Sequence, residues 1–248
     1  MKIKFLKIIF SDLNSTFLKK KIINGGLFLL PSGPGLANFK INDNYHFALR
    51  KADYVMFDSG YFVLLLFFLK LIKVKKTSGY KFMQILFEII ENKKVKKIFL
   101  LEPSLKTSKK NYSYFKKKFN IDVDNYVCPV YDINNIFDKK LLNILKLKKP
   151  KFILINIGGG VQEILGHYLK EKLNYKATIL CTGAALAFYT REQAPITNFF
   201  DYIYLGWLVR ILFSPKIFIP RYFNAIKLIK LVFFNKVDVI AEPNKPKA

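Results

Sequence analysis

The chain has 248 residues, which is enough for one large α/β domain or for one domain with an appendage. Hydrophobic residues make up 52% of the chain, which excludes a disordered protein. The formal net charge of +25 indicates an anionic partner, such as nucleic acid, an anionic membrane surface or a phosphorylated substrate. Lys, Asn, Ile, Phe and Tyr are abundant together, as a biased genome would give, so the charge alone does not choose among these partners.

The cysteines and histidines exclude two kinds of site. Cys128 and Cys181 form no C-x-x-C pair and are too few for a disulfide scaffold, so we expect a reducing compartment. His46 and His167 have no neighbours at metal-ligand spacing, so we expect no zinc site. The N-terminus lacks the features of a signal peptide, and the apolar run from Tyr61 to Leu69 is shorter than the about 20 residues that a bilayer span needs. We therefore expect a cytoplasmic protein.

The first fifty residues predict a hairpin or edge element, a strand and a helix. Residues up to about 24 mix Lys with apolar residues, which is compatible with a β-hairpin or an edge element. Leu27 to Leu30 is typical of a strand, and it runs into Pro31-Ser32-Gly33-Pro34-Gly35, which we expect to be a non-helical turn. Apolar residues at helical spacing then predict a helix from Leu36 to Arg50.

A carboxylate follows the next predicted strand. Tyr54 to Phe57 is a short apolar run that ends directly before Asp58, and a helix is predicted from Tyr61 to about Val74. Ligands of open α/β sheets bind outside the carboxyl ends of the strands, so a carboxylate at this place is a candidate general base. The alternative is that Asp58 caps the helix that follows it.

The middle of the chain continues the alternation of helices and strands. Lys75 to Gly79 is a basic, glycine-containing loop in which Ser78 can cap a helix with apolar residues from Phe82 to Ile89. Further strands are predicted at 97–101, 126–130, 151–156 and 177–181, and helices at 108–119 and from the glycines at 158–160 to Leu173. This order predicts an α/β fold with a Rossmann-like, mostly parallel sheet covered by helices.

A glycine loop follows the clearest buried strand. Gly158, Gly159 and Gly160 precede Gln162 and Glu163 at the start of a predicted helix, where backbone N–H groups can approach a phosphate and the helix dipole favours its charge. Two plainer alternatives are a tight turn and ordinary polar residues at a helix start. The third glycine of a dinucleotide motif is missing, and no acidic residue ends the next strand, so a nicotinamide-dependent enzyme is disfavoured.

The chain changes character at about residue 198. Aromatic and aliphatic residues recur at helical spacing from Phe200 to Ile211, which predicts one helical face that ends at Pro215. Pro220 begins a last basic, aromatic segment, and the tail from Ala241 is expected to be disordered. We therefore divide the chain into an α/β domain at 1–197, a helical appendage at 198–240 and a tail at 241–248.

Four groups of residues together match the motifs of one enzyme family. They are Ala52 to Ser59, Lys76 to Phe82, Gly158 to Glu163, and a C-terminal set of Gln193-Ala194-Pro195, Leu205 to Leu212, Pro215-Lys216 and Arg221-Tyr222. The C-terminal set is the most specific, because it keeps its order and approximate spacing over roughly thirty residues. From about Leu27 to Tyr222 the chain resembles the WecG/TagA/CpsF glycosyltransferases, glycosyltransferase family 26.

The resemblance implies an activity and a set of site residues. It implies inverting transfer of a sugar, usually an N-acetylmannosamine derivative, from a UDP-sugar to a polyprenyl-diphosphate-linked acceptor in cell-surface polysaccharide biosynthesis, with no metal and no cofactor. It implies that Asp58 is the base, with Glu163 as a competitor nearer the nucleotide. The expected substrate-binding residues are Ser32, Gly33, Lys76, Gly79, Gly158, Gly159, Gly160, Gln162, Glu163, Gly183, Arg210, Lys216 and Arg221. The cations among them would stabilise the leaving diphosphate, although Arg210 could instead be a solvated helix residue.

The chain departs from the family pattern at several polar positions. The loop from Pro31 to Gly35 lacks the family's Thr and Asn, Ser59 stands in place of a Gly, Ala187 in place of an Asp and Gly206 in place of a Glu. These groups are expected near the donor sugar and the base, so the departures concern the donor more than the fold. The alternative is a family member that binds sugar nucleotide or membrane without catalysis. A nucleic-acid binder is disfavoured because no recognition motif is present.

The C-terminal segment also predicts a location. Its aromatic residues and its cations, Lys216, Arg221, Lys227 and Lys230, are typical of an amphipathic segment that lies in the headgroup plane of an anionic membrane. We therefore expect a peripheral protein on the cytoplasmic, inner face of the plasma membrane, and a homo-oligomer is compatible with this. The alternative is that the segment packs on the domain or forms an oligomer contact. Trp207 is expected in the core or facing the membrane rather than stacked on uracil.

Overall fold

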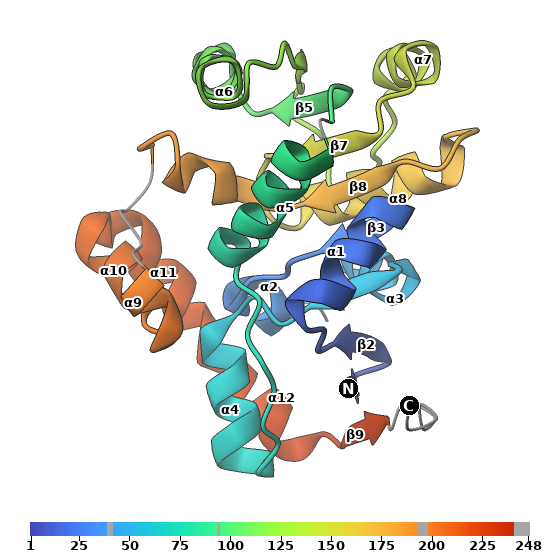
Figure 1. Cartoon of the computed structure of the whole chain (residues 1–248). Coiled ribbons are helices and arrows are strands. Elements are labelled where there is room, and N and C mark those ends of the chain that lie inside the picture. The colour runs from blue at the N-terminus through green and yellow to red at the C-terminus, as the bar shows by residue number, and fades with distance from the viewer. Residues whose placement is uncertain (39–41, 94, 193–197, 241–248) are drawn as a thin grey trace, which may run out of the picture.

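The computed structural model describes residues 1–38, 42–93, 95–192 and 198–240, and within them a mostly parallel sheet forms the centre of the molecule (Figure 1). Its strands are β1 (Lys2–Phe5), β2 (Ile8–Ser11), β3 (Gly26–Leu29), β4 (Tyr54–Met56), β5 (Ile98–Glu102), β6 (Asp124–Val127), β7 (Phe152–Ile155), β8 (Thr178–Cys181) and β9 (Val237–Ile240). They pair in the order β6-β5-β7-β8-β3-β4-β2-β1-β9. The strands from β6 to β2 are parallel, and β1 pairs antiparallel with both β2 and β9. The predicted α/β fold class is thereby confirmed.

Helices cover both faces of this sheet. They are α1 (Ser15–Asn24), α2 (Gly33–Ala37), α3 (Asp43–Lys51), α4 (Gly60–Lys70), α5 (Gly79–Lys93), α6 (Leu105–Phe119), α7 (Lys139–Lys148), α8 (Val161–Lys172), α9 (Asn198–Tyr202), α10 (Gly206–Phe213), α11 (Pro215–Ala225) and α12 (Lys227–Phe234), with a 3₁₀ segment at Gly183–Phe188. Among the helices of the described ranges, none is both long and apolar enough to cross a membrane.

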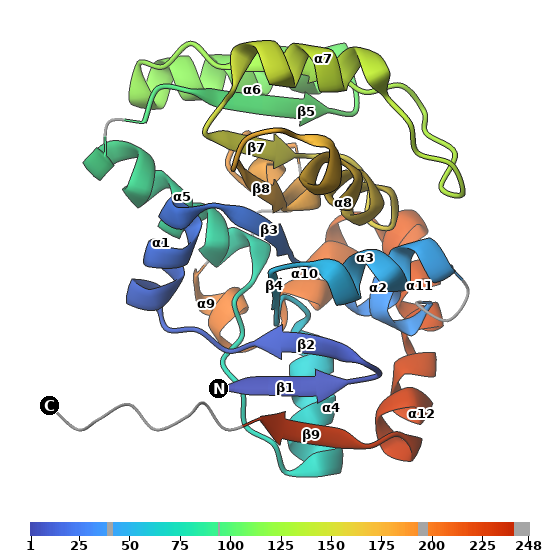
Figure 2. The same ribbon diagram turned by 90° about the vertical axis from the view of Figure 1, so that its right-hand side faces the viewer.

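The strands bury alternate residues in two apolar cores. Leu27 and Leu29 of β3 belong to the core under α3, α7 and α8, whereas Phe28 belongs to the core under α1, α5 and α6. Figure 2 shows α1 and α5 on one side of the sheet and α3 and α8 on the other. Burial on both faces explains why these strands are continuous apolar runs rather than alternating ones. Gly166 lets α8 approach the sheet closely, because an added Cβ would lie 2.6 Å from the sulfur of Cys181.

The N-terminal half differs from the sequence prediction at four places. Residues up to about 24 were expected to form a hairpin or an edge element; β1 and β2 form a hairpin, but residues 15–24 form the helix α1. The segment around Pro34 was expected to be non-helical, but it forms α2, because a proline in the first helical turn lacks only an N–H that would have no partner there. The helix predicted from Leu36 to Arg50 is instead α2 and α3, with residues 39–41 outside the described ranges. The helix predicted to reach Val74 ends at Lys70, where Leu71 adopts a left-handed φ of 54°.

The C-terminal segment packs on the rest of the protein and returns to the sheet. The single helical face predicted from Phe200 to Ile211 is divided into α9 and α10, and Tyr204 between them has a positive φ of 63°. Pro220 lies inside α11 rather than beginning a new segment. Leu228 of α12 is fully buried in the core, and α12 runs beside α4 (Figure 1). The following strand β9, which the sequence reading missed together with α7, forms the sheet edge next to β1 (Figure 2).

Three predicted features lie outside the described residues. They are the Gln193-Ala194-Pro195 motif, the domain boundary placed after residue 197 and the tail at 241–248.

Candidate functional site

A pocket at the carboxyl ends of β3 and β4 is assembled from five separate parts of the chain, at residues 32–33, 58–61, 76–80, 188 and 201–222. The predicted residues that line it are Ser32, Gly33, Asp58, Lys76, Gly79 and Arg210. The lining residues that sequence reasoning did not place there include Tyr61, Tyr80, Phe188, Asp201, Tyr204, Trp207 and Tyr222. Most of these are aromatic residues. Tyr80, Trp207 and Tyr222 belong to the matched motifs, but the sequence reading assigned none of them to the site. Trp207, which was expected in the core or facing a membrane, lines this pocket instead.

Asp58 stands between the end of β4 and the start of α5. Its Oδ1 accepts a 2.6 Å hydrogen bond from the backbone N–H of Gly79, the first residue of α5. The alternative role as a cap of α4 is wrong, because Ser59 caps that helix by accepting the N–H of Phe62 at 3.2 Å. Loss of hydration raises the pKa of Asp58, while the charge of Arg210, the Gly79 N–H and the charge of Lys76 lower it. The net pKa is raised, which makes this carboxylate a better proton acceptor.

Glycine at position 79 allows the close approach of α5 to Asp58. A Cβ added at Gly79 would lie 2.9 Å from the Cβ of Ala185, so a larger residue would push the first turn of α5 out of place. The N-terminus of a helix carries a partial positive charge that stabilises a nearby carboxylate. Gly79 therefore contributes to the site through its backbone.

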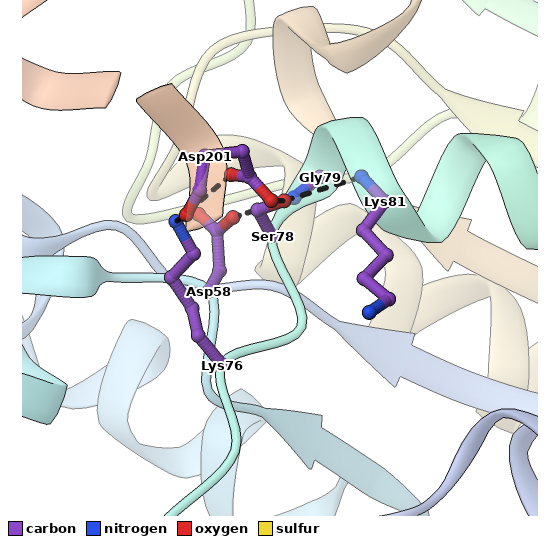
Figure 3. A network of polar contacts seen from close by, with 6 residues as sticks. All are labelled: Asp58, Lys76, Ser78, Gly79, Lys81 and Asp201. Carbon is purple, nitrogen blue, oxygen red and sulfur yellow. Dashed lines mark hydrogen bonds and ion pairs between the residues drawn. The ribbon is translucent and has the colours of Figure 1, made fainter. Parts of the chain in front are cut away.

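The basic loop before α5 is tied to α9 by a polar network (Figure 3). Lys76 Nζ donates to the backbone oxygen of Asp201 at 2.6 Å and to its Oδ1 at 2.8 Å. Ser78 Oγ donates to Asp201 Oδ2 at 2.8 Å and accepts the N–H of Lys81 at 3.1 Å, so it caps α5 as predicted. The Lys76 side chain is only 7% exposed, and its ammonium group lies 5.1 Å from the ring centre of Tyr204. Lys76 is therefore a paired cation held at the rim of the pocket.

Arg210 brings a second cation to Asp58 from the C-terminal segment. Its guanidinium carbon lies 4.9 Å from the ring centre of Phe188, and its Nε is buried without a hydrogen-bond partner among the described residues. Tyr222 of α11 lies beside it, where burial raises the pKa of the phenol and the Arg210 charge lowers it. The alternative that Arg210 is a solvated helix residue does not agree with the burial of its Nε. Arg210 has a donor left for an anionic ligand.

The glycine loop forms a separate network at the end of β7. The N–H of Gly160, where φ is 92°, donates to Glu163 Oε2 at 2.7 Å, and Gln162 Nε2 donates to Glu163 Oε1 at 3.1 Å. The N–H of Gly183 donates to Gln162 Oε1 at 2.7 Å. Glu163 is 1% exposed, and its desolvation raises its pKa to about 7. Because both of its oxygens accept hydrogen bonds within the protein, Glu163 is a poorer candidate base than Asp58.

The remaining predicted residues are placed in two ways. Gly158 and Gly159 are exposed, and nothing lies within 4 Å of a Cβ added at either position, so their backbone can be reached by a ligand. Lys216 and Arg221 lie on the surface of α11 outside the lining of the Asp58 pocket, and Arg221 rests over the ring of Phe218. Of the four predicted cations, the structure brings Lys76 and Arg210 to Asp58.

A carboxylate and two cations are gathered at the carboxyl ends of the strands, which is where open α/β sheets bind their ligands. The chain belongs to the glycosyl transferase WecG/TagA/CpsF family, whose model matches residues 15–240. This match covers the Asp58 pocket, the glycine loop and the C-terminal helices. The family supports a glycosyltransferase of cell-surface polymer synthesis. A search of curated proteins returned no match to the chain.

Proposed function

We propose that the protein is an inverting, metal-independent glycosyltransferase. It moves a sugar of the N-acetylmannosamine type or a related one from a UDP-sugar to a polyprenyl-diphosphate-linked acceptor. The observation that carries the proposal is the environment of Asp58, whose carboxylate is held by the N-terminus of α5 and lies near enough to Arg210 for the pKa to be lowered by its charge. The Asp58 pocket thus holds a candidate base and a candidate phosphate-binding cation together.

Asp58 performs the proton transfer in this mechanism. The acceptor hydroxyl oxygen attacks the anomeric carbon from the side opposite the diphosphate, and Asp58 takes the hydroxyl proton. A new C–O bond forms, the bond to the diphosphate oxygen breaks, and UDP leaves with the electron pair. The transition state resembles an oxocarbenium ion, as in glycoside hydrolysis. A general base in this position contributes about 10²–10⁴-fold to the rate.

Cations and backbone donors would stabilise the leaving diphosphate. The planar guanidinium of Arg210 matches a phosphate, and its Nε has no competing partner among the described residues. Gly158 and Gly159 add accessible backbone at the N-terminal end of α8, where the helix dipole favours negative charge. Lys76 contributes a positive charge, and its ammonium group is also paired with the carboxylate of Asp201.

The C-terminal helices and the end of α4 carry exposed apolar residues. Phe223 of α11 is 74% exposed, and Leu71 after α4 is 86% exposed. Other exposed apolar residues of these segments are Phe68, Phe213, Ile217, Ile226, Phe233 and Phe234. Lys216, Arg221, Lys227 and Lys230 are exposed among them. This composition suits the headgroup region of an anionic membrane, where each cation contributes about 1 kcal/mol. We place the protein on the cytoplasmic face of the plasma membrane, where a lipid-linked acceptor can reach Asp58.

The activity is tested by UDP release. The purified protein is incubated with UDP-sugars and a polyprenyl-diphosphate sugar in anionic vesicles, and Asp58→Asn is compared with the wild type. We expect Asp58→Asn to lose at least about 100-fold in turnover while it still binds UDP, because the amide keeps the shape but not the basicity. Asp122→Asn, at an exposed pair with Lys116, is the matched control. Turnover of Asp58→Asn above about a tenth of wild type contradicts the assignment of the base. UDP binding without release by the wild type supports the non-catalytic alternative.

The membrane role is tested by sedimentation with vesicles. Phe223→Ser and Phe234→Ser together should reduce co-sedimentation with anionic vesicles, because both side chains are exposed in the C-terminal helices. Phe137→Ser changes an equally exposed phenylalanine elsewhere and should leave binding unchanged. Equal binding by both variants and the wild type contradicts the proposed membrane surface.

A further inference from the structure

A second pocket lies along the same edge of the sheet as Asp58. Asn156 directly follows β7, Asn111 comes from α6, and Gly183 follows β8, while Glu192 lies farther along the chain. Asn156 is two residues before the glycine loop, and Gly183 is bonded to Gln162 of that loop. In the sheet order, β7 is three strand steps from β4, about 14 Å at the usual spacing. The second pocket therefore lies beside the candidate phosphate loop, on the same edge of the sheet as Asp58.

Several oxygen atoms of this pocket accept no hydrogen bond from the described residues. Asn111 and Asn156 are 1% and 7% exposed, and each donates its Nδ2 to the same oxygen of Glu102 at 2.9 Å. This arrangement uses the donor end of each amide and leaves both Oδ1 atoms without a partner among the described residues. Glu192 Oε1 pairs with Lys110 at 3.1 Å, while its Oε2 has no partner in the part of the chain that the structure describes. Buried polar atoms are rarely left unpaired unless a water or a ligand completes them.

A group of free acceptors fits a ligand that brings hydroxyl donors. Carboxylate and amide oxygens both accept hydrogen bonds from hydroxyls. A carboxylate near the carboxyl end of a strand binds ribose hydroxyls in other doubly wound nucleotide-binding folds. The glycine loop beside the pocket would hold the phosphates that are attached to the same ribose.

We propose that this pocket binds the ribose of the nucleotide donor, whose hydroxyls donate to Asn111, Asn156 and Glu192. Glu102 is a positioning residue, because it holds both amides with their oxygens free. The inference rests on the proposed use of a UDP-sugar. The donor would then lie along the sheet edge, with its ribose in this pocket, its diphosphate near the glycine loop and its sugar at Asp58.

The test compares the binding of UDP with that of 2′-deoxy-UDP and 3′-deoxy-UDP by calorimetry. We expect the wild type to bind UDP about 10- to 100-fold more tightly than at least one analogue, which is the range for a hydrogen bond to a charged group. Glu192→Ala should weaken UDP binding and reduce that ratio toward one. Glu192→Gln keeps an oxygen acceptor and should retain part of the ratio. Lys110→Ala removes the ion pair of Glu192 but leaves its carboxylate, so the ratio should stay at the wild-type value.

The outcomes separate this inference from the proposed function. If the wild type binds UDP and both analogues equally, or if Glu192→Ala and Asn156→Ala keep the wild-type ratio, the ribose assignment is overturned and the UDP proposal stands. If the wild type binds no UDP, both fall. Asn156→Ala leaves Glu102 with one amide fewer and could fail to fold, so Glu192, whose side chain is nearer the surface, provides the decisive variant.

Discussion

The glycine-loop region and the Asp58 pocket lie on one sheet edge but are built in different ways. In the glycine loop, Gly160, Gln162 and Glu163 bond to one another within three residues of sequence, and Gln162 accepts a further hydrogen bond from Gly183, 21 positions along the chain. In the Asp58 pocket, the bond from Lys76 to Asp201 joins residues 125 positions apart, and Arg210 comes from still farther along the chain. The first region depends mainly on contacts between residues close in sequence, whereas the second needs the C-terminal helices to be docked.

Because the two regions are built differently, we expect substitutions in them to affect different properties of the protein. Changes at Glu163 should alter stability, because its side chain is buried and hydrogen-bonded within the glycine-loop network. Changes in the C-terminal segment should alter activity, because α9, α10 and α11 supply Asp201, Arg210 and Tyr222 to the pocket. The following three changes test this separation, beginning with the largest expected effect.

Arg210→Ala should reduce kcat/KM by about 10²–10³-fold, which is the usual loss when a preorganised donor to developing charge is removed. Arg210 lines the pocket, and its Nε has no partner among the described residues, whereas Lys76 in the same pocket is already paired with Asp201. Steady-state UDP release measures the effect. Arg221→Ala removes the same residue type from the surface of α11 and should stay within a few-fold of wild type. If Arg210→Ala and Arg221→Ala lost equal activity, the position of Arg210 in the pocket would not be the cause of its effect.

Glu163→Gln should flatten the dependence of stability on pH. The pKa of Glu163 is raised from 4.5 to about 7 in the folded protein, so between these values the native state binds more protons than the unfolded state. The free energy of unfolding therefore falls as pH rises through this window, by up to roughly 3 kcal/mol from this group. Urea unfolding at several pH values should show a shallower decline for Glu163→Gln than for wild type. The glutamine also loses one accepted hydrogen bond at every pH, so the slope and not the absolute stability is the readout.

If the pH dependence of stability were the same in Glu163→Gln and wild type, the raised pKa of the buried Glu163 would be contradicted. Glu171→Gln is the control, since Glu171 lies on the same helix but its side chain is exposed to solvent.

Asp201→Asn should move the acid limb of the kcat/KM profile toward lower pH. The charge of Asp201 raises the pKa of Asp58, so its removal lowers that pKa. The released Lys76 ammonium acts in the same direction, because its charge also lowers the pKa of Asp58. Asp201→Glu keeps the charge and should leave the limb near its wild-type position. A shift toward higher pH in Asp201→Asn would mean that Lys76 moves away from Asp58 once it is unpaired.

The sequence alone determined the fold class, the family and the position of Asp58 at a strand end. These features depend on local patterns: apolar runs of strand length, helix caps such as Ser78 and a glycine loop before α8. Such patterns follow from nearest-neighbour geometry and from the need to bury both faces of a parallel sheet.

Only the tertiary structure decided which residues complete the site. Arg210 and Arg221 look alike in sequence, since each is a cation among aromatic residues, but packing places one beside Asp58 and the other on the surface. Asp201 carries no motif, and only the docking of α9 makes it the partner of Lys76. The strand β9 is a four-residue run that becomes recognisable only beside β1. In each case the deciding interaction joins distant parts of the chain, so it cannot be predicted from local residue preferences.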